Sequence, residues 1–183
     1  MNLVYKVFAI LHIAAELCPS SFALKVDEDV VFNIDRFLGG VHKYFFPEKA
    51  DIYCRVWHGM LPKRNASGKW YISTDQYPGK VYPDFCSGPA YALTRSAARR
   101  ILNNTHLLPD IQVEDVLITG MIAEKARVNR VPLPEMFHRK NLFARKCDTL
   151  PDGTPALLAK HNFKTYGEMR EAWKRISRPE CPQ

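Results

Sequence analysis

The chain has 183 residues, of which 46% are apolar and 25% are charged, as in one folded domain with a sizeable core. This composition excludes a low-complexity chain, and the sequence contains no internal repeat. The net charge of +7 arises in residues 125–183, which carry 13 of the 26 basic side chains but 6 of the 19 acidic ones. A basic segment suits an anionic partner or is a solvated face. Because no arginine-rich run or nucleic-acid motif is present, we expect no nucleic acid partner.

The five cysteines are too widely spaced for a zinc site, since no two form a CxxC pair. Their spacing permits disulfides in an oxidising compartment, with one cysteine left over. Two glycosylation sequons, at Asn65 and Asn103, also fit a secretory lumen.

The first half of the chain predicts helices and strands in alternation. Residues 2–17 are apolar but interrupted by Lys6, His12 and Glu16, which favours an amphipathic helix packed on the domain over a signal peptide or a membrane span. The elements expected next are a turn at 18–21, a strand at 22–26, a short helix at about 34–45, a strand at 51–58 and a long aromatic-rich loop at 59–83.

The second half continues this alternation. The expected elements are a strand at 87–94, helices at 96–103 and 113–125, a strand at 128–131, a proline-rich basic connector, a short apolar run at 156–159 and a last helix from Thr165, where Glu168 completes a capping box. Such alternation favours an α/β sandwich with a mostly parallel sheet flanked by helices. Ligands bind such sheets at the carboxyl ends of the strands.

Three carboxylates, Asp27, Glu28 and Asp29, follow the apolar strand 22–26 directly. Carboxylate oxygens are hard ligands for Mg²⁺ or Mn²⁺, and such ions are often shared with substrate phosphates. Since side chains alternate along an extended segment, we expect Asp27 and Asp29 to face one way and Glu28 the other. The alternative is an exposed acidic turn.

Two further features could take part in catalysis. Glu114 and Asp115 stand at a helix start, where they could cap the helix or provide a general base that accepts a proton from a hydroxyl. His161 follows the run "ALLAK" and could complete a manganese shell begun by a carboxylate, with His138 as a competing candidate.

These pieces together resemble one family. The stretches "LKVDEDVVFN", "KWYIS…YP…VYPDFCSGPAYALT" and "VEDVLITGMI", in this order, are similar to motifs of the β-1,3-galactosyltransferase and β-1,3-N-acetylglucosaminyltransferase family, glycosyltransferase family 31. The closing "ALLAKHNFKTYGEMREAWKRI" is similar to its last strand, histidine and helix. The resemblance spans essentially all of residues 1–183, which we interpret as a single, incomplete catalytic domain.

The resemblance implies a GT-A-type, Rossmann-like fold, a UDP-sugar donor, Mn²⁺, a Golgi-lumenal setting and inverting transfer of a sugar to a glycan hydroxyl. It implies that Asp29 and His161 bind the metal and that Asp115 is the catalytic base. It places Lys25, Asp27 and Glu28 at the donor, and it places around donor sugar and acceptor the residues Trp70, Tyr77, Ser87, Gly88 and Glu114.

The chain also departs from the family pattern. Glu28 stands where the family usually has Asp, and Pro89 and Ala90 replace more flexible residues. The resemblance further implies first strands that hold the uridine, and a membrane anchor, upstream of the position of Asn2; membrane association would come only through that anchor. The alternative to an active enzyme is therefore an inactive or truncated member that acts as a binding partner, with an unpaired sheet edge.

Overall fold

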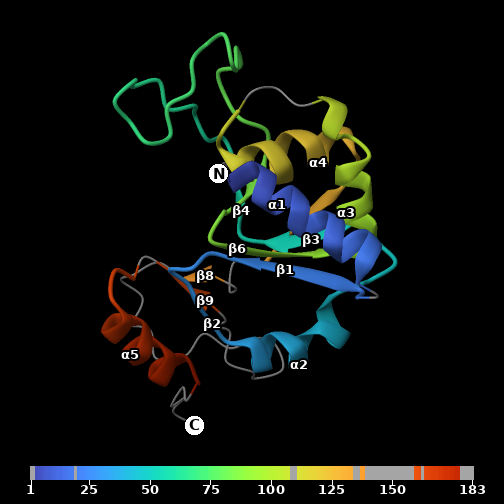
Figure 1. Cartoon of the computed structure of the whole chain (residues 1–183), viewed down its shortest axis with the longest axis vertical. Coiled ribbons are helices and arrows are strands. Elements are labelled where there is room, and N and C mark those ends of the chain that lie inside the picture. The colour runs from blue at the N-terminus through green and yellow to red at the C-terminus, as the bar shows by residue number, and fades with distance from the viewer. Residues whose placement is uncertain are drawn as a thin grey trace.

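The computed structural model describes residues 3–18, 20–107, 111–133, 137–138, 159–161 and 163–177. Its helices are α1 (Leu3–His12) with the π-helical segment Ile13–Leu17, α2 (Ile34–Tyr44), α3 (Arg95–Leu102), the 3₁₀ turn Thr105–Leu107, the π-helical segment Val116–Ile122 leading into α4 (Ala123–Lys125), and α5 (Tyr166–Ser177). Its strands are β1 (Phe22–Val26), β2 (Val31–Phe32), β3 (Asp51–Cys54), β4 (Val56–Trp57), β5 (Phe85–Cys86), β6 (Ala90–Thr94), β7 (Asn129–Pro132), β8 (Phe137–His138) and β9 (Ala159–Lys160). Figure 1 shows their arrangement.

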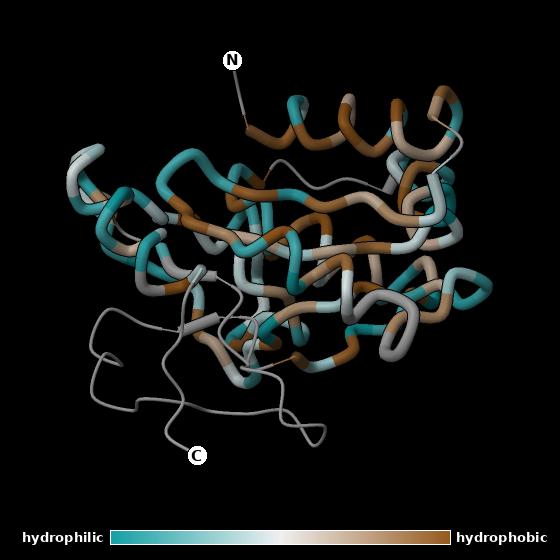
Figure 2. The backbone as a smooth tube through the Cα atoms, turned by 90° about the horizontal axis from the view of Figure 1, so that it is seen from below, coloured by the Kyte–Doolittle hydropathy of each residue, from teal (hydrophilic) through white to brown (hydrophobic). Residues whose placement is uncertain are grey.

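The N-terminal helix packs on the domain, as predicted. Val4, Val7, Leu11 and Ala15 are buried in the main core. Because they recur every three or four residues, they form one face of the helix. Figure 2 shows this helix next to the N-terminus as mostly hydrophobic, with a few hydrophilic positions. No helix within the described ranges is both long and apolar enough to cross a bilayer.

The central sheet has the strand order β1-β6-β3-β7. β6 is antiparallel to both β1 and β3, whereas β3 and β7 are parallel. The prediction of a mostly parallel sheet is therefore wrong for the described strands. The physical reason is the connection between β3 and β6, which runs through a long loop and β4 and β5 without a crossover helix, so it returns the chain in the opposite direction.

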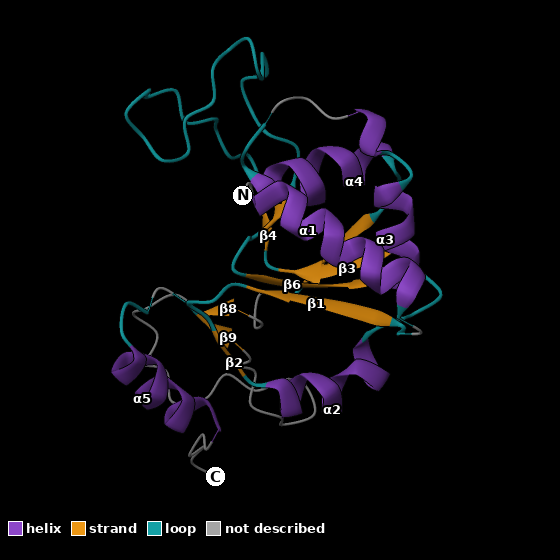
Figure 3. Cartoon of the chain, in the orientation of Figure 1, coloured by secondary structure: helices purple, strands orange, loops and turns teal. Residues whose placement is uncertain are grey.

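Helices cover both faces of this sheet (Figures 1 and 3). α1, α3 and α4 lie on one face, over the main core cluster. α2 lies on the other face, where Phe37 and Phe45 pack against Tyr53 of β3 in a second cluster. The fold is thus mixed α/β, and its two cores fix the sheet between the layers.

Two predicted strands are shorter in the structure. The stretch 51–58 divides at Arg55 into β3 and β4, and β6 begins at Ala90 rather than at Ser87. β4 pairs with β5 in a small separate sheet, and β2, β9 and β8 form another. The capping box at the last helix is confirmed, because Thr165 and Glu168 each accept a hydrogen bond from the other's backbone N–H.

The segment 59–83 is a loop, as predicted, and Arg64 organises it. The Arg64 guanidinium donates to the carbonyls of Ile72 (2.8 Å) and Ser73 (2.7 Å) and, further along, to those of Tyr77 (2.7 Å) and Gly79 (3.0 Å). These bonds give the loop a defined shape without regular secondary structure.

A disulfide joins Cys54 at the end of β3 to Cys86 in β5. Cys18 is a free, exposed thiol. Cys147 and Cys181 lie outside the described residues. The predicted use of cysteines in disulfides is therefore confirmed for one pair.

Candidate active site

The acidic triplet lies at the edge of the central sheet where the strands β1, β3 and β7 end. Because β6 is antiparallel to its neighbours, β1, β3 and β7 all run in the same direction, and their carboxyl ends meet the amino end of β6 at that edge. The backbone N–H of Asp27, just after β1, donates to the carbonyl of Pro89, just before β6, at 2.8 Å. The predicted site therefore lies at the carboxyl ends of β1, β3 and β7, as expected, even though β6 runs in the opposite direction.

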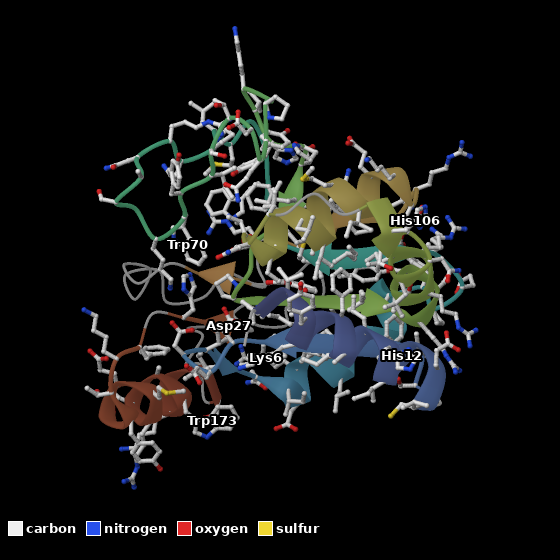
Figure 4. The ribbon with its side chains drawn as sticks, turned by 45° about the horizontal axis from the view of Figure 1, so that its top comes forward. Lys6, His12, Asp27, Trp70, His106 and Trp173 are labelled. Carbon is white, nitrogen blue, oxygen red and sulfur yellow. A yellow bond between two sulfur atoms is a disulfide. The ribbon has the colours of Figure 1, made fainter. Side chains whose placement is uncertain are left out.

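A cavity of about 650 Å³ opens at this edge. Most of the predicted site residues line it, namely Lys25, Asp27, Asp29, Trp70, Gly88, Glu114, Asp115 and His161. Figure 4 shows Trp70 on the long loop and Asp27 after β1 on the same side of the molecule. Segments far apart in the sequence thus converge on one space.

Three predicted residues lie outside this lining. Glu28 is exposed, whereas Asp27 and Asp29 line the cavity, as expected. The backbone is not extended there, however: Glu28 and Asp29 form a turn in which the N–H of Val30 donates to the carbonyl of Asp27 at 3.2 Å. Tyr77 packs on Tyr82 with ring centroids 5.0 Å apart, and its hydroxyl donates to a backbone carbonyl of the loop. Ser87 is buried, and its backbone N–H is bonded to the carbonyl after β3.

Among the described residues, Lys25 places a positive charge directly beside the triplet. It lies in β1 with 6% of its surface exposed, and its ammonium is 2.5 Å from Oδ1 of Asp27. The same ammonium donates to the carbonyl of Gly88 at 2.5 Å and lies 3.7 Å from Oε2 of Glu114. A buried lysine is stable only when paired, and these partners provide the pairing.

Glu114 is the most deeply buried acid of the site, with 4% exposed. The hydroxyl of Tyr91, in β6, donates to Oε1 of Glu114 at 2.6 Å. Burial raises the pKa of Glu114 to about 7, although the charge of Lys25 and the hydrogen bond from Tyr91 act to lower it. Glu114 therefore exchanges a proton near neutral pH.

Asp115 is half-buried and accepts two backbone hydrogen bonds. The N–H of Gly88 donates to Oδ2 at 3.2 Å and that of Val116 to Oδ1 at 2.9 Å. Burial raises the pKa of Asp115 above its usual value, against these two bonds and the charge of Lys25. Gly88 has little room for a side chain, since a Cβ there would lie 3.0 Å from Oδ2 of Asp115.

A hydroxyl holds the start of this helix in place. Thr119 donates to the backbone carbonyl of Asp115 at 2.6 Å and accepts a hydrogen bond from the N–H of Cys86 at 2.8 Å. The helix that begins with Glu114 and Asp115 is thereby tied to β5. No sequence pattern pointed to this buried threonine.

The metal-ligating residues are only partly assembled. Asp29 and His161 line the same cavity, but among the described residues no three of His, Cys, Asp and Glu lie close enough to hold a metal ion. The competing candidate His138 is in β8, and its side chain falls outside the described part of the structure. A carboxylate and an imidazole suit a divalent cation whose remaining ligands are oxygens of a bound substrate.

Several lining residues were missed by sequence reasoning. Lys69 and Tyr71 flank the predicted Trp70 and line the cavity with it, and the Lys69 ammonium lies 4.6 Å from the centroid of the Trp70 indole. The adjacency of a cation and two aromatic residues in "KWY" could have pointed to them. Gln112 and Val113, just before Glu114, carry no comparable signal.

Residues 1–134 match the model of the family described as Galactosyltransferase. The chain is similar to "Beta-1,3-galactosyltransferase 2" of Mus musculus and of Homo sapiens, each 30% identical over 138 residues, which are 74% of this chain and 32% of the relative. It is also similar to "Beta-1,3-galactosyltransferase bre-2" of Caenorhabditis elegans, 32% identical over 148 residues, which are 75% of this chain and 40% of the relative. The chain thus spans 32 to 40% of the length of these relatives.

Proposed function

Because the chain belongs to the galactosyltransferase family, we propose that it serves a metal-dependent, inverting hexosyltransferase reaction. In this reaction galactose or N-acetylglucosamine passes from a UDP-sugar to a hydroxyl of a glycan on protein or lipid, forming a β-1,3 linkage. The observation that carries the proposal is the convergence of Asp27, Asp29, Asp115 and His161 on one cavity at the strand ends. A mixed sheet between helical layers supports assignment to the GT-A type of fold.

Asp115 is the proposed general base. In an inverting displacement, the acceptor oxygen bonds to the anomeric carbon while the bond from that carbon to the diphosphate oxygen breaks, and the acceptor proton passes to Asp115. Burial raises the pKa of Asp115 toward neutral pH, and a base with a higher pKa accepts a proton more readily. Glu114 is less suited, because Tyr91 and Lys25 occupy its two oxygens.

Asp29 and His161 are the proposed protein ligands of Mn²⁺, and the donor diphosphate completes the shell. When bound, a divalent cation stabilises the negative charge that grows on a departing diphosphate. Asp27 is assigned to the donor side, with Lys25 holding its carboxylate in position, whereas the exposed Glu28 lies outside this cavity. Trp70 and Gly88 are assigned to the region around the donor sugar.

A Golgi-lumenal setting is part of the proposal. The disulfide between Cys54 and Cys86 supports an oxidising compartment, because such bonds rarely persist in the cytosol. The exposed position of Asn65 within its sequon is compatible with glycosylation there.

The test is UDP release from UDP-galactose and UDP-N-acetylglucosamine with Mn²⁺ and a panel of glycan acceptors. We expect Asp115→Asn to lower turnover by roughly 10²- to 10⁴-fold, since it removes the base but keeps the size of the side chain. Asp75→Asn, at an exposed loop position outside the lining of the cavity, is the matched control. Turnover that persists in Asp115→Asn, or after chelation of the metal, contradicts the assigned roles.

The second candidate is an inactive family member that acts as a binding partner. The observation that favours it is the position of β1 at the edge of the central sheet, where one side of the strand has no partner among the described strands. A folded protein that binds UDP but turns over neither donor with any acceptor supports this alternative.

A further inference from the structure

The sequence carries two glycosylation sequons, Asn65-Ala66-Ser67 in the long loop and Asn103-Asn104-Thr105 at the end of α3. The catalytic roles proposed above use neither of them. Asn65 and Asn103 are both exposed, but the structure places their sequons in different backbone conformations. This difference decides which of the two asparagines is suited to carry a glycan.

The amide oxygen of Asn65 accepts two hydrogen bonds from Ser67, the third residue of its own sequon. The Ser67 hydroxyl donates to Oδ1 of Asn65 at 2.9 Å, and the backbone N–H of Ser67 donates to the same atom at 3.2 Å. The N–H of Gly68 donates to the carbonyl of Asn65 at 3.0 Å and closes the turn. Asn side chains stabilise turns by bonding to the backbone two residues further on. The hydroxyl that the sequon requires therefore contacts the amide that the modification targets.

This geometry prepares the side-chain amide of Asn65 for attack on a sugar. An amide nitrogen is a poor nucleophile, because its lone pair is delocalised onto the carbonyl oxygen. Donors aimed at that oxygen stabilise negative charge on it, so Nδ2 loses a proton more readily. In the transfer, Nδ2 forms a bond to the anomeric carbon of a lipid-diphosphate oligosaccharide, and the bond from that carbon to the diphosphate oxygen breaks. The Nδ2 proton passes to a base of the lumenal transferase, and the lipid diphosphate departs.

The second sequon is held in helical backbone. Asn103 is the C-cap of α3 with helical dihedral angles (φ −67°, ψ −12°), and its N–H donates to the carbonyl of Arg99 at 3.0 Å. The Thr105 hydroxyl donates its proton to the carbonyl of Leu102 at 2.9 Å. Because a hydroxyl has a single proton to donate, this proton does not reach the amide oxygen of Asn103.

The turn at Asn65 depends on short-range contacts. Its three hydrogen bonds join residues two or three positions apart, so the turn can form in a nascent chain before the central sheet is complete. Residues 63–70 are exposed in the folded protein, and residues 65–67 lie outside the lining of the site cavity. A glycan on Asn65 is therefore compatible with both the fold and the proposed site.

We infer that Asn65 carries an N-linked glycan and that Asn103 does not. The inference goes beyond the proposed catalytic function, and it takes from that proposal only the lumenal setting. Its basis is the contact between the Ser67 hydroxyl and the Asn65 amide, which has no counterpart between Thr105 and Asn103 in the described structure.

The test translates the full chain, fused behind a cleavable secretory signal peptide, in the presence of microsomes. Chains that have entered the lumen are identified by their resistance to added protease, and only these chains are scored. We expect the main translocated species to show one discrete shift in gel mobility that peptide-N-glycosidase removes. Mass spectrometry of the deglycosylated protein should then find an aspartate at position 65 and an unchanged asparagine at position 103.

Substitutions in the two sequons identify the modified residue. Asn65→Gln and Ser67→Ala should each abolish the mobility shift, whereas Ser67→Thr, which keeps the hydroxyl, should retain it. Asn103→Gln and Thr105→Ala are the matched controls and should leave the shift unchanged. Because the glycan is added to the nascent chain, a variant that later fails to fold still reports on its sequon.

The outcomes distinguish this inference from the proposed function. A translocated parent chain without a glycan, a main species with two glycans, or a shift that persists in Asn65→Gln overturns the inference. Since the added signal peptide brings the chain into the lumen, none of these results bears on the catalytic roles, which the assay of UDP release tests. A glycan on Asn65 in a chain that releases no UDP supports the inference while the proposed enzymatic activity fails.

Discussion

At the level of single residues, Lys25 is the partner of the acidic triplet that the sequence did not identify. Three acids after a buried strand require a positive partner, and the sequence alone suggested a metal ion. In the described part of the structure, the ammonium of Lys25, from within the same strand, lies directly beside Asp27. The residue types at the site were thus predictable, but their pairing depends on which side chains the sheet buries, and a linear pattern does not contain this information.

The raised pKa of Glu114 predicts how stability depends on pH. Its folded-state pKa of about 7 exceeds the ordinary value of 4.5, so between these values the folded protein binds more protons than the unfolded chain. The free energy of unfolding therefore falls as pH rises from about 4.5 to 7, by up to about 1.4 kcal/mol per pH unit from this group. Above pH 7 the contribution of Glu114 no longer changes.

Urea denaturation between pH 4.5 and 8 checks this expectation. Glu114→Gln should show a shallower decline of unfolding free energy over that range than the parent, with Asp115 accounting for part of what remains. Glu124→Gln, at an exposed helix position, should keep the slope of the parent. Identical slopes in Glu114→Gln and the parent would show that Glu114 titrates normally in the folded protein.

At the level of elements, the order of helices and strands followed from periodicity, but the direction of β6 did not. Hydrophobic patterns identify a strand and its faces, whereas its direction depends on how the chain returns to the sheet. The chain returns from β3 to β6 through residues 55–89, which include the long loop and one cysteine of the disulfide. A predicted alternation of helices and strands identifies neither the path of this loop nor the disulfide. The same holds for Arg64, whose four carbonyl partners come from turns of irregular backbone.

Replacing Arg64 should make the loop 59–83 open more often. Arg64→Ala removes the donors that hold four backbone carbonyls, so the loop should open more often while the two cores remain intact. If the local stability falls by about 1.4 kcal/mol, chymotrypsin should cleave the loop about tenfold faster. The cleavage sites to follow are the aromatic residues Trp70 and Tyr71, since proline follows Tyr77 and blocks cleavage there.

The matched control for this experiment is Lys80→Ala, at an exposed position of the same loop. It removes a positive charge but none of the four hydrogen bonds, so its cleavage rate should match that of the parent. Equal rates in Arg64→Ala and the parent mean that packing of the loop, rather than Arg64, sets its shape.

At the scale of the whole molecule, the disulfide links the two parts that build the site. Cys54 ends β3 of the central sheet, and Cys86 lies in β5, next to the turn that carries Gly88 toward Asp115. Both cysteines are fully buried within the main core. The bond closes a loop with a sequence separation of 32 residues, which includes the aromatic segment 59–83.

Replacing both cysteines by alanine should therefore lower the free energy of unfolding by about 3 to 4 kcal/mol, because the unfolded chain regains the freedom of that loop. Urea denaturation under non-reducing conditions measures the change, and Cys18→Ser, at the exposed free thiol, should leave the unfolding free energy unchanged. The reduced parent should resemble the double variant. A loss below about 1 kcal/mol in both would mean that the unfolded chain already holds the two ends of this loop close together, so that the central sheet and the site turn do not depend on the bond for their alignment.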